Sequence, residues 1–155
     1  MPRVHHVKKA RKEIKRGDQV IVAVGDSYYY WEFRHGGRQV SKTPPRRSQL
    51  TQSDKLSRAY QAEEALNDLD RSLSYEDAAS EVDSIASDIR DIAQEYRDSI
   101  ENMPESLQQS SVAEQCEEKA DELESWADSL ESEAQSWDEE TEMDSALDEL
   151  EGCPL

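Results

Sequence analysis

The sequence is poor in the residues that build a large hydrophobic core. Hydrophobic residues make up 35% of its 155 residues, below the roughly 45–50% that is usual for globular proteins. A further 35% of the residues are charged, so the chain cannot bury a large core for its length. We therefore expect a protein that is elongated, or of which one part is mobile.

Cysteines and long apolar runs are also scarce. The two cysteines, Cys116 and Cys153, have no metal-site spacing and provide no disulfide framework, which favours a reducing, cytoplasmic location. The N-terminus is basic but lacks the apolar segment of a signal peptide. No run approaches the 18 apolar residues that a membrane-spanning helix needs, so we expect no membrane partner.

The patterns that mark common enzymes and metal proteins are missing. No glycine-rich phosphate loop follows a strand, and Ser27 in "GDSYYY" does not fit the G-x-S-x-G nucleophile motif. His5, His6 and His35 have no partner at zinc-binding spacing, and "DEETEMDSALDE" lacks the glycine of a calcium-binding loop. We therefore predict a non-enzymatic protein with no catalytic residues, no metal and no cofactor.

What the sequence does have is a strong separation of charge. The formal net charge is −18, but residues 1–50 hold 12 Lys and Arg against 4 Asp and Glu, a net of +8. Residues 51–155 hold 6 against 32, a net of −26. Such asymmetry predicts two parts with separate functions, or one part that masks the other. We accordingly divide the chain at residue 50.

The first part is predicted to be a small β-structure. Residues 1–16 are basic and are interpreted as an arm that could become helical after Val7. Strands are expected at 20–24, 28–33 and 39–42, separated by glycine-containing turns and ended by the prolines of "TPPRR". The predicted structure is a three-stranded antiparallel meander, with residues 1–50 as one domain.

Alternation along the central strand assigns its two faces. Trp31 is expected on the buried face, together with Tyr29 and Phe33, whereas Tyr28, Tyr30 and Glu32 point the other way. A three-stranded sheet needs an apolar cover on one face. We expect this cover to come from Val20, Val22 and Val24.

The second part, residues 51–155, has the 3.6-residue apolar period of amphipathic helices. Helices are predicted at roughly 53–73, 75–102 and 111–140. Ser53 is a candidate N-cap of the first, Ser74 with Asp77 resembles a capping box for the second, and Ser111 with Glu114 resembles one for the third. The apolar seams of the later helices are Ala78, Val82, Ile85, Ile89, Ile92 and Tyr96, and Cys116, Ala120, Leu123, Ala127, Leu130, Ala134 and Trp137.

These patterns predict an α+β protein. Short connections favour antiparallel helices, so the small sheet should be followed by a long acidic helical hairpin, or by a three-helix bundle resembling a coiled coil. The first helix should pack on the hairpin through Leu66, Leu69 and Leu73. Seam residues such as Leu123 and Leu130 could equally serve a dimer.

An aromatic and basic patch in the first part suggests nucleic-acid contact. Cations gain affinity by releasing counterions from phosphates, and tyrosine rings can stack on unpaired bases. The predicted nucleic-acid-binding residues are Lys8, Lys9, Arg11, Tyr28, Tyr30, Arg34, Arg38, Lys42, Arg46 and Arg47. Two other interpretations stay open: the aromatics form a small core that the cations solvate, or the cations dock against an acidic helix.

The string "YYYWEFRHGGRQVSKT" resembles the small N-terminal sheet of phage-type integrases, the arm-site DNA-binding domain, where an aromatic strand, a glycine turn and a basic strand face DNA. The resemblance implies DNA contact by residues 28–43 and no recombinase activity, since no integrase catalytic residues follow. The wider stretch "MPRVHHVKKARK…SKTPPRRSQLTQS", with "NMPESLQ" later, is similar to small uncharacterised phage and bacterial proteins, which implies a viral or mobile-element origin.

Three functions remain at this point. The chain could be a small nucleic-acid-binding protein whose acidic helices engage a partner or mask the basic part. It could instead be an inhibitor whose acidic helices mimic nucleic acid and occupy a basic groove on a host defence or nucleic-acid enzyme, so that residues 76–151 meet a basic protein partner. The third alternative is a structural coiled-coil adaptor.

Overall fold

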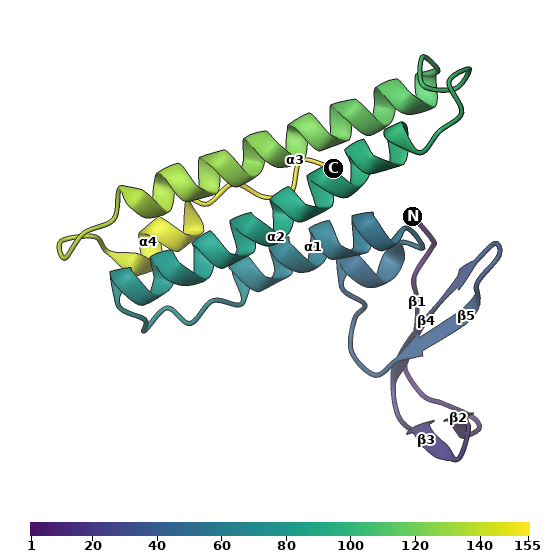
Figure 1. Cartoon of the computed structure of the whole chain (residues 1–155). Helices are drawn as coiled ribbons and strands as arrows, with labels where there is room; N and C mark the ends of the chain where they lie inside the picture. The colour runs from purple at the N-terminus through teal and green to yellow at the C-terminus, as the bar shows by residue number, and fades with distance from the viewer. The chain divides into compact units, whose positions relative to one another are not determined.

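The computed structural model describes all 155 residues and divides them into two compact units, Met1–Ser57 and Arg58–Leu155 (Figure 1). Unit 1 holds every β-strand, and unit 2 is helical. The predicted α+β class, with a small antiparallel sheet followed by long helices, is confirmed. No helix combines the length and the apolar character that crossing a bilayer requires.

Unit 1 contains a three-stranded antiparallel sheet of β1 (His5–Val7), β4 (Tyr28–Phe33) and β5 (Gly37–Ser41). The central strand is β4, with β1 and β5 on either side. Its tyrosines pair with both neighbours, because Tyr30 lies opposite His5 on β1 and Val40 on β5. The two strands predicted at 28–33 and 39–42 are thus present, but the third strand comes from the N-terminal arm.

The prediction of a strand at 20–24 within that sheet was wrong. This segment forms β3 (Gln19–Val22), which pairs with β2 (Ile14–Arg16) in a separate hairpin. The two residues between these strands include Gly17, whose φ of +61° suits a tight hairpin turn. Pairing β3 with β2 closes a loop of two residues, whereas pairing it with β4 would close the longer loop 23–27 at a somewhat higher entropic cost. After Val7 the arm forms bends and then strand β2, and no helix.

Only one of the three valines expected beneath the sheet is buried. Val22 is fully buried and Trp31 is 4% exposed, whereas Val20 and Val24 are 43% and 63% exposed. A register shift lies between the pairs Ile14–Val22 and Lys15–Val20. Such a bulge breaks the alternation of faces, which separates Val20 from Val22, and Val24 lies beyond the end of β3. The burial of Trp31 is confirmed.

Unit 2 is built on the antiparallel pair α2 (Tyr75–Glu101) and α3 (Ser111–Gln135). The shorter α1 (Asp54–Asn67) begins in unit 1 and continues into unit 2, and α4 (Met143–Asp148) follows α3. The bounds predicted for α2 agree with the structure within one residue. The first helix was predicted six residues too long and the third five residues too long.

Local side-chain hydrogen bonds explain both early helix ends. The Asp70 carboxylate accepts from the backbone N–H of Ser72 at 2.9 Å, and the Asp138 carboxylate accepts from that of Glu140 at 2.9 Å. Aspartate turns of this kind compete with helix continuation. The apolar period continues past α1 nevertheless, and Leu69 and Leu73 pack from the turn against the core.

The helix caps follow the predictions at two of three positions. Ser74 accepts from the backbone N–H of Asp77 at 3.2 Å, and Ser53 accepts from that of Leu56 at 3.4 Å. The cap of α3 is Ser110, which accepts from the N–H of Ala113, and not Ser111. The sequence "QSSV" offers adjacent serines, so pattern alone cannot distinguish them.

The core of unit 2 lies along the predicted seams. Of the thirteen seam residues only Ile85 and Cys116 keep intermediate exposure, and the others are buried. Leu66 of α1 is 6% exposed and belongs to the same core. Trp126 is a core residue that the seam pattern missed; its indole N–H donates to the carbonyl of Glu151 at 2.7 Å, because the C-terminal segment lies over it.

Candidate nucleic-acid interface

The tyrosine face of the sheet is a stack that runs across all three strands. The rings of His5 and Tyr30 are parallel within 11°, with centroids 4.8 Å apart. On the β5 side the guanidinium carbon of Arg38 lies 4.7 Å from the centre of the Tyr30 ring. Since β4 lies between β1 and β5, His5 and Arg38 cover opposite sides of Tyr30. Tyr28 is next to it, with a ring-centroid distance of 6.3 Å.

The opposite face of β4 holds a second stack and the buried tryptophan. The rings of His6 and Tyr29 are 4.5 Å apart and parallel within 13°. Trp31 is buried, and its indole nitrogen has no hydrogen-bond partner. Both histidines of the N-terminal arm thus pack on tyrosines. The sequence prediction missed this role because it left the arm outside the sheet.

The candidate cations of the sheet are partly neutralised by neighbours. Arg38 lies 2.6 Å from the carboxylate of Glu32, and their hydrogen bond raises the pKa of Arg38. Lys42 lies 2.9 Å from the carboxylate of Asp26, and this contact lowers the pKa of Asp26. Arg34, in the β4–β5 turn, is exposed and forms no ion pair. Arg38 and Lys42 are therefore already engaged in ion pairs within unit 1.

Beyond the sheet, two candidates lie next to a short helix. Arg46 precedes the 3-10 helix η1 (Arg47–Leu50), and its backbone N–H donates to the side-chain oxygen of Gln49 at 3.1 Å. Arg47 is the first residue of η1 and is only partly exposed. Both arginines therefore lie beyond the three-stranded sheet, whose last strand ends at Ser41.

The densest exposed charge of unit 1 lies on a segment that we call the basic ribbon, residues 8–22. It comprises the connection after β1 and the β2–β3 hairpin. Backbone hydrogen bonds hold its start in place, because Ala10 donates to Asp26 at 2.8 Å and accepts from Gly25 at 2.9 Å. Six exposed cations lie on it: Lys8, Lys9, Arg11, Lys12, Lys15 and Arg16.

Most of these ribbon cations have no acidic neighbour. Lys15 lies 3.4 Å from Glu13, and Arg16 donates to the side-chain oxygen of Gln39 at 3.1 Å. The remaining four, Lys8, Lys9, Arg11 and Lys12, make no ion pair in the structure. Three ribbon cations, Lys12, Lys15 and Arg16, were missed by the sequence prediction, although the basic run "KKARKEIKR" contains all of them.

The strand register decides which candidates lie together. Val7 is opposite Tyr28 and Ser41 is opposite Tyr29, so the start of the ribbon and Lys42 lie at the same end of the sheet. Arg34 follows the last residue of β4 and lies at the other end. The predicted cations therefore form two groups, of which the ribbon group is the larger and the less neutralised.

Unit 2 presents the opposite charge. Its cations are few, and α2 uses two of them to hold α3. Arg90 binds Asp128 at 2.8 Å and also binds Glu131, and Arg97 binds Asp121 at 2.9 Å and also binds Glu124. Hydrogen bonds to these carboxylates raise the pKa of both arginines.

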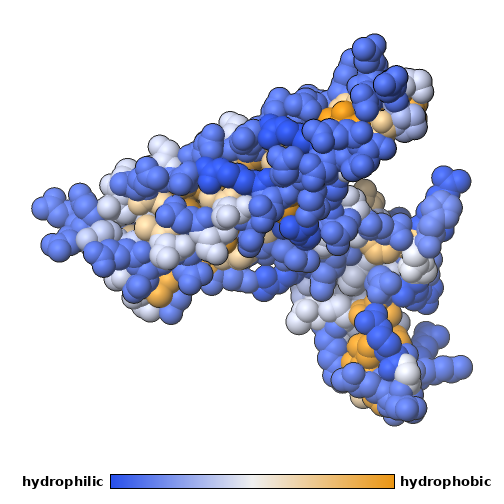
Figure 2. Space-filling view, viewed as in Figure 1, coloured by the Kyte–Doolittle hydropathy of each residue, from blue (hydrophilic) through white to orange (hydrophobic).

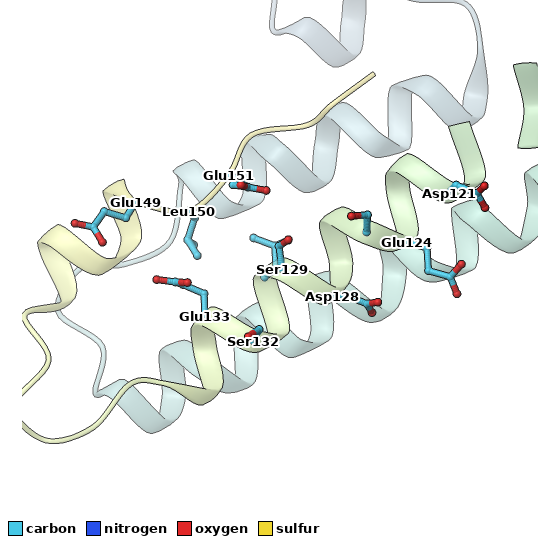
Figure 3. A pocket seen from close by; sticks show the side chains of 11 residues that line it. Asp121, Glu124, Asp128, Ser129, Ser132, Glu133, Glu149, Leu150 and Glu151 are labelled. Atoms are coloured by element: carbon cyan, nitrogen blue, oxygen red, sulfur yellow. The ribbon is translucent and has the colours of Figure 1, made fainter. Parts of the chain in front are cut away.

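An acidic groove of about 750 Å³ lies between α3 and the C-terminal segment (Figure 3). Six carboxylates line it, and Asp121, Glu124 and Asp128 of these are held by arginines. Glu133, Glu149 and Glu151 form no ion pair. Figure 2 shows the wider surface as predominantly hydrophilic over the helices. The carboxylates without an arginine partner leave this groove negatively charged.

No family model, curated protein or solved structure matches this chain. No group of three or more His, Cys, Asp and Glu side chains is arranged to hold a metal ion.

Proposed function

We propose that this chain is a small non-enzymatic protein that associates with nucleic acid through unit 1. The supporting observation is the exposed and largely unpaired charge of the basic ribbon. Residues 1–57 hold 13 Lys and Arg against 5 Asp and Glu. Binding of this kind draws its free energy from counterions released by the phosphates, and needs no enclosed pocket. The resemblance of residues 28–43 to integrase arm-site sheets agrees with this function, as does the mobile-element origin suggested by the similarity to small phage and bacterial proteins.

Unit 2 would then limit or direct the binding. Residues 58–155 hold 31 carboxylates against 5 cations, and ion pairs within the unit occupy Arg58, Arg71, Arg90 and Arg97. A surplus of this size repels phosphates and attracts basic surfaces. The acidic helices therefore either mask the basic unit or recruit a basic protein.

A mobility-shift experiment at low salt tests this function. The full chain and a fragment of residues 1–57 are titrated against labelled duplex and single-stranded DNA and RNA, and circular dichroism verifies that the fragment is folded. We expect binding that weakens steeply as salt rises. Tighter binding by the fragment than by the full chain would assign a masking role to unit 2. A lack of binding by both proteins would refute the proposal.

The second candidate is an inhibitor that mimics nucleic acid, and the surplus of carboxylates on unit 2 favours it. α3 alone is about 37 Å long at 1.5 Å per residue, with acidic side chains along it. If this candidate is right, the full chain competes with duplex DNA for basic nucleic-acid enzymes, and unit 1 variants keep that activity. Competition that depends on the basic ribbon instead would support the first candidate.

A further inference from the structure

The stacking geometry of the sheet limits how unit 1 could bind nucleic acid. Proteins that hold single strands through aromatic residues stack each base on an open ring face. Tyr30 has no open face, because His5 and Arg38 cover its two sides. One side of Tyr29 is covered by His6. Tyr29 and Tyr30 therefore serve in cross-strand packing, and stacking of an unpaired base on Tyr30 would require His5 or Arg38 to move away.

The basic ribbon contains a two-stranded hairpin with exposed cations, which is a form that can bind in the groove of a nucleic-acid duplex. A pair of antiparallel strands is about 5 Å wide between backbones, and the major groove of B-form DNA, about 12 Å wide, admits a two-stranded ribbon. The corresponding groove of an RNA helix is too narrow. Lys15 and Arg16 project from β2, and Lys8, Lys9, Arg11 and Lys12 precede it.

The ribbon also exposes apolar side chains, which a purely phosphate-binding arm does not need. Val20 on β3 is 43% exposed, and Val24, two residues beyond the ribbon, is 63% exposed. Figure 2 shows hydrophobic surface over the β2–β3 region. Small apolar groups in a major groove contact thymine methyl groups. The exposed valines could thus contact thymine methyl groups, while the cations around them contact the phosphates that border the groove.

From these observations we infer that the basic ribbon, and not the tyrosine face, is the surface that binds nucleic acid, and that its ligand is duplex DNA. The inference rests on the proposed function and narrows it to one surface and one ligand. The lysines contact phosphates on the two sides of the major groove, and the hairpin enters between them.

The test is fluorescence anisotropy of the full chain with a labelled 20-bp duplex and with one of its strands, in 50 mM salt. The variant Lys9→Gln/Lys12→Gln removes two exposed ribbon cations. The matched control Arg3→Gln/Arg34→Gln removes two exposed cations that also form no ion pair and lie at the other end of the sheet. Both variants carry the same net charge.

We expect the wild-type chain to prefer the duplex, and the ribbon variant to bind it at least tenfold more weakly. The control should lose less than threefold. When the titration is repeated at several salt concentrations, the slope of log K against log salt should be less steep for the ribbon variant than for the wild type by about 1.8, or about 0.9 for each lost phosphate contact.

Three results would overturn the inference. An equal loss of duplex affinity in the two variants would show that net charge alone matters. A preference of the wild type for the single strand would show that bases are stacked. In both cases the proposed function stands. The third result is an absence of binding to either DNA. In that event the proposed function fails as well, and vesicles containing phosphatidylserine test whether the valines and lysines bind an anionic membrane instead.

Discussion

Replacing Leu66 with aspartate should loosen the whole of unit 2. Leu66 is 6% exposed and lies in the core shared by α1, α2 and α3. Loss of its burial costs about 2–3 kcal/mol, and a carboxylate in the same apolar place costs at least about 2 kcal/mol more. A loss of about 4 kcal/mol or more is a large part of the 5–15 kcal/mol that stabilises a typical domain. At about 4–8 °C per kcal/mol for a domain of this size, the melting midpoint of unit 2 should fall by about 16 °C or more.

The assay is thermal unfolding followed by circular dichroism at 222 nm. Leu107→Asp is the matched control, since Leu107 is 50% exposed in the α2–α3 connection and the substitution adds the same charge. Surface changes of this type alter stability by less than about 0.5 kcal/mol. If Leu66→Asp leaves helix content and midpoint unchanged, then α1 is a linker and the reasoning on the three-helix core is refuted.

Three further predictions concern the charges of unit 2. Arg97→Met should lower the melting midpoint by a few degrees, because it removes the contacts to Asp121 and Glu124; an unchanged midpoint would show that the apolar seam alone holds α2 to α3. Arg71 lowers the pKa of Asp148 below its ordinary 3.8, so this pair stabilises the fold above about pH 4 and loses its contribution as the pH falls through the lowered value. The melting midpoint of Asp148→Asn, measured from pH 7 to pH 2.5, should therefore decrease less in acid than that of the wild type, and parallel curves would contradict this. Raising NaCl from 20 to 500 mM should raise the midpoint of the wild type because salt screens the surplus carboxylates; a fall would mean that the ion pairs dominate.

The helical half was predictable because its signal repeats. The apolar seam that begins in α3 alternates steps of three and four residues from Ala120 to Trp137, and all of these seam residues are buried. Each repetition adds independent evidence for the same face. The ends of α1 and α3 were not predictable from this pattern, because they depend on aspartate turns at Asp70 and Asp138 that compete with the helix locally.

The sheet was harder because short strands repeat little. β1 has three residues, and its sequence "HHV" lies in a basic run that reads as an arm. Its place beside β4 depends on the stacking of His5 and His6 on tyrosines, a contact between residues more than twenty positions apart. The candidate cations were recognisable from composition. Their division between the two ends of the sheet could be seen only from the register of β4 with β1 and β5.

Amide NMR of the full 17.7 kDa chain, with and without a 20-bp duplex at low salt, tests the central claim most directly. We predict that shift changes concentrate at residues 8–22, and that the amides along α2 and α3 keep their positions unless the duplex displaces a masking contact. Changes confined to α2 and α3, or an unchanged spectrum at saturating duplex, would contradict nucleic-acid binding through the basic ribbon.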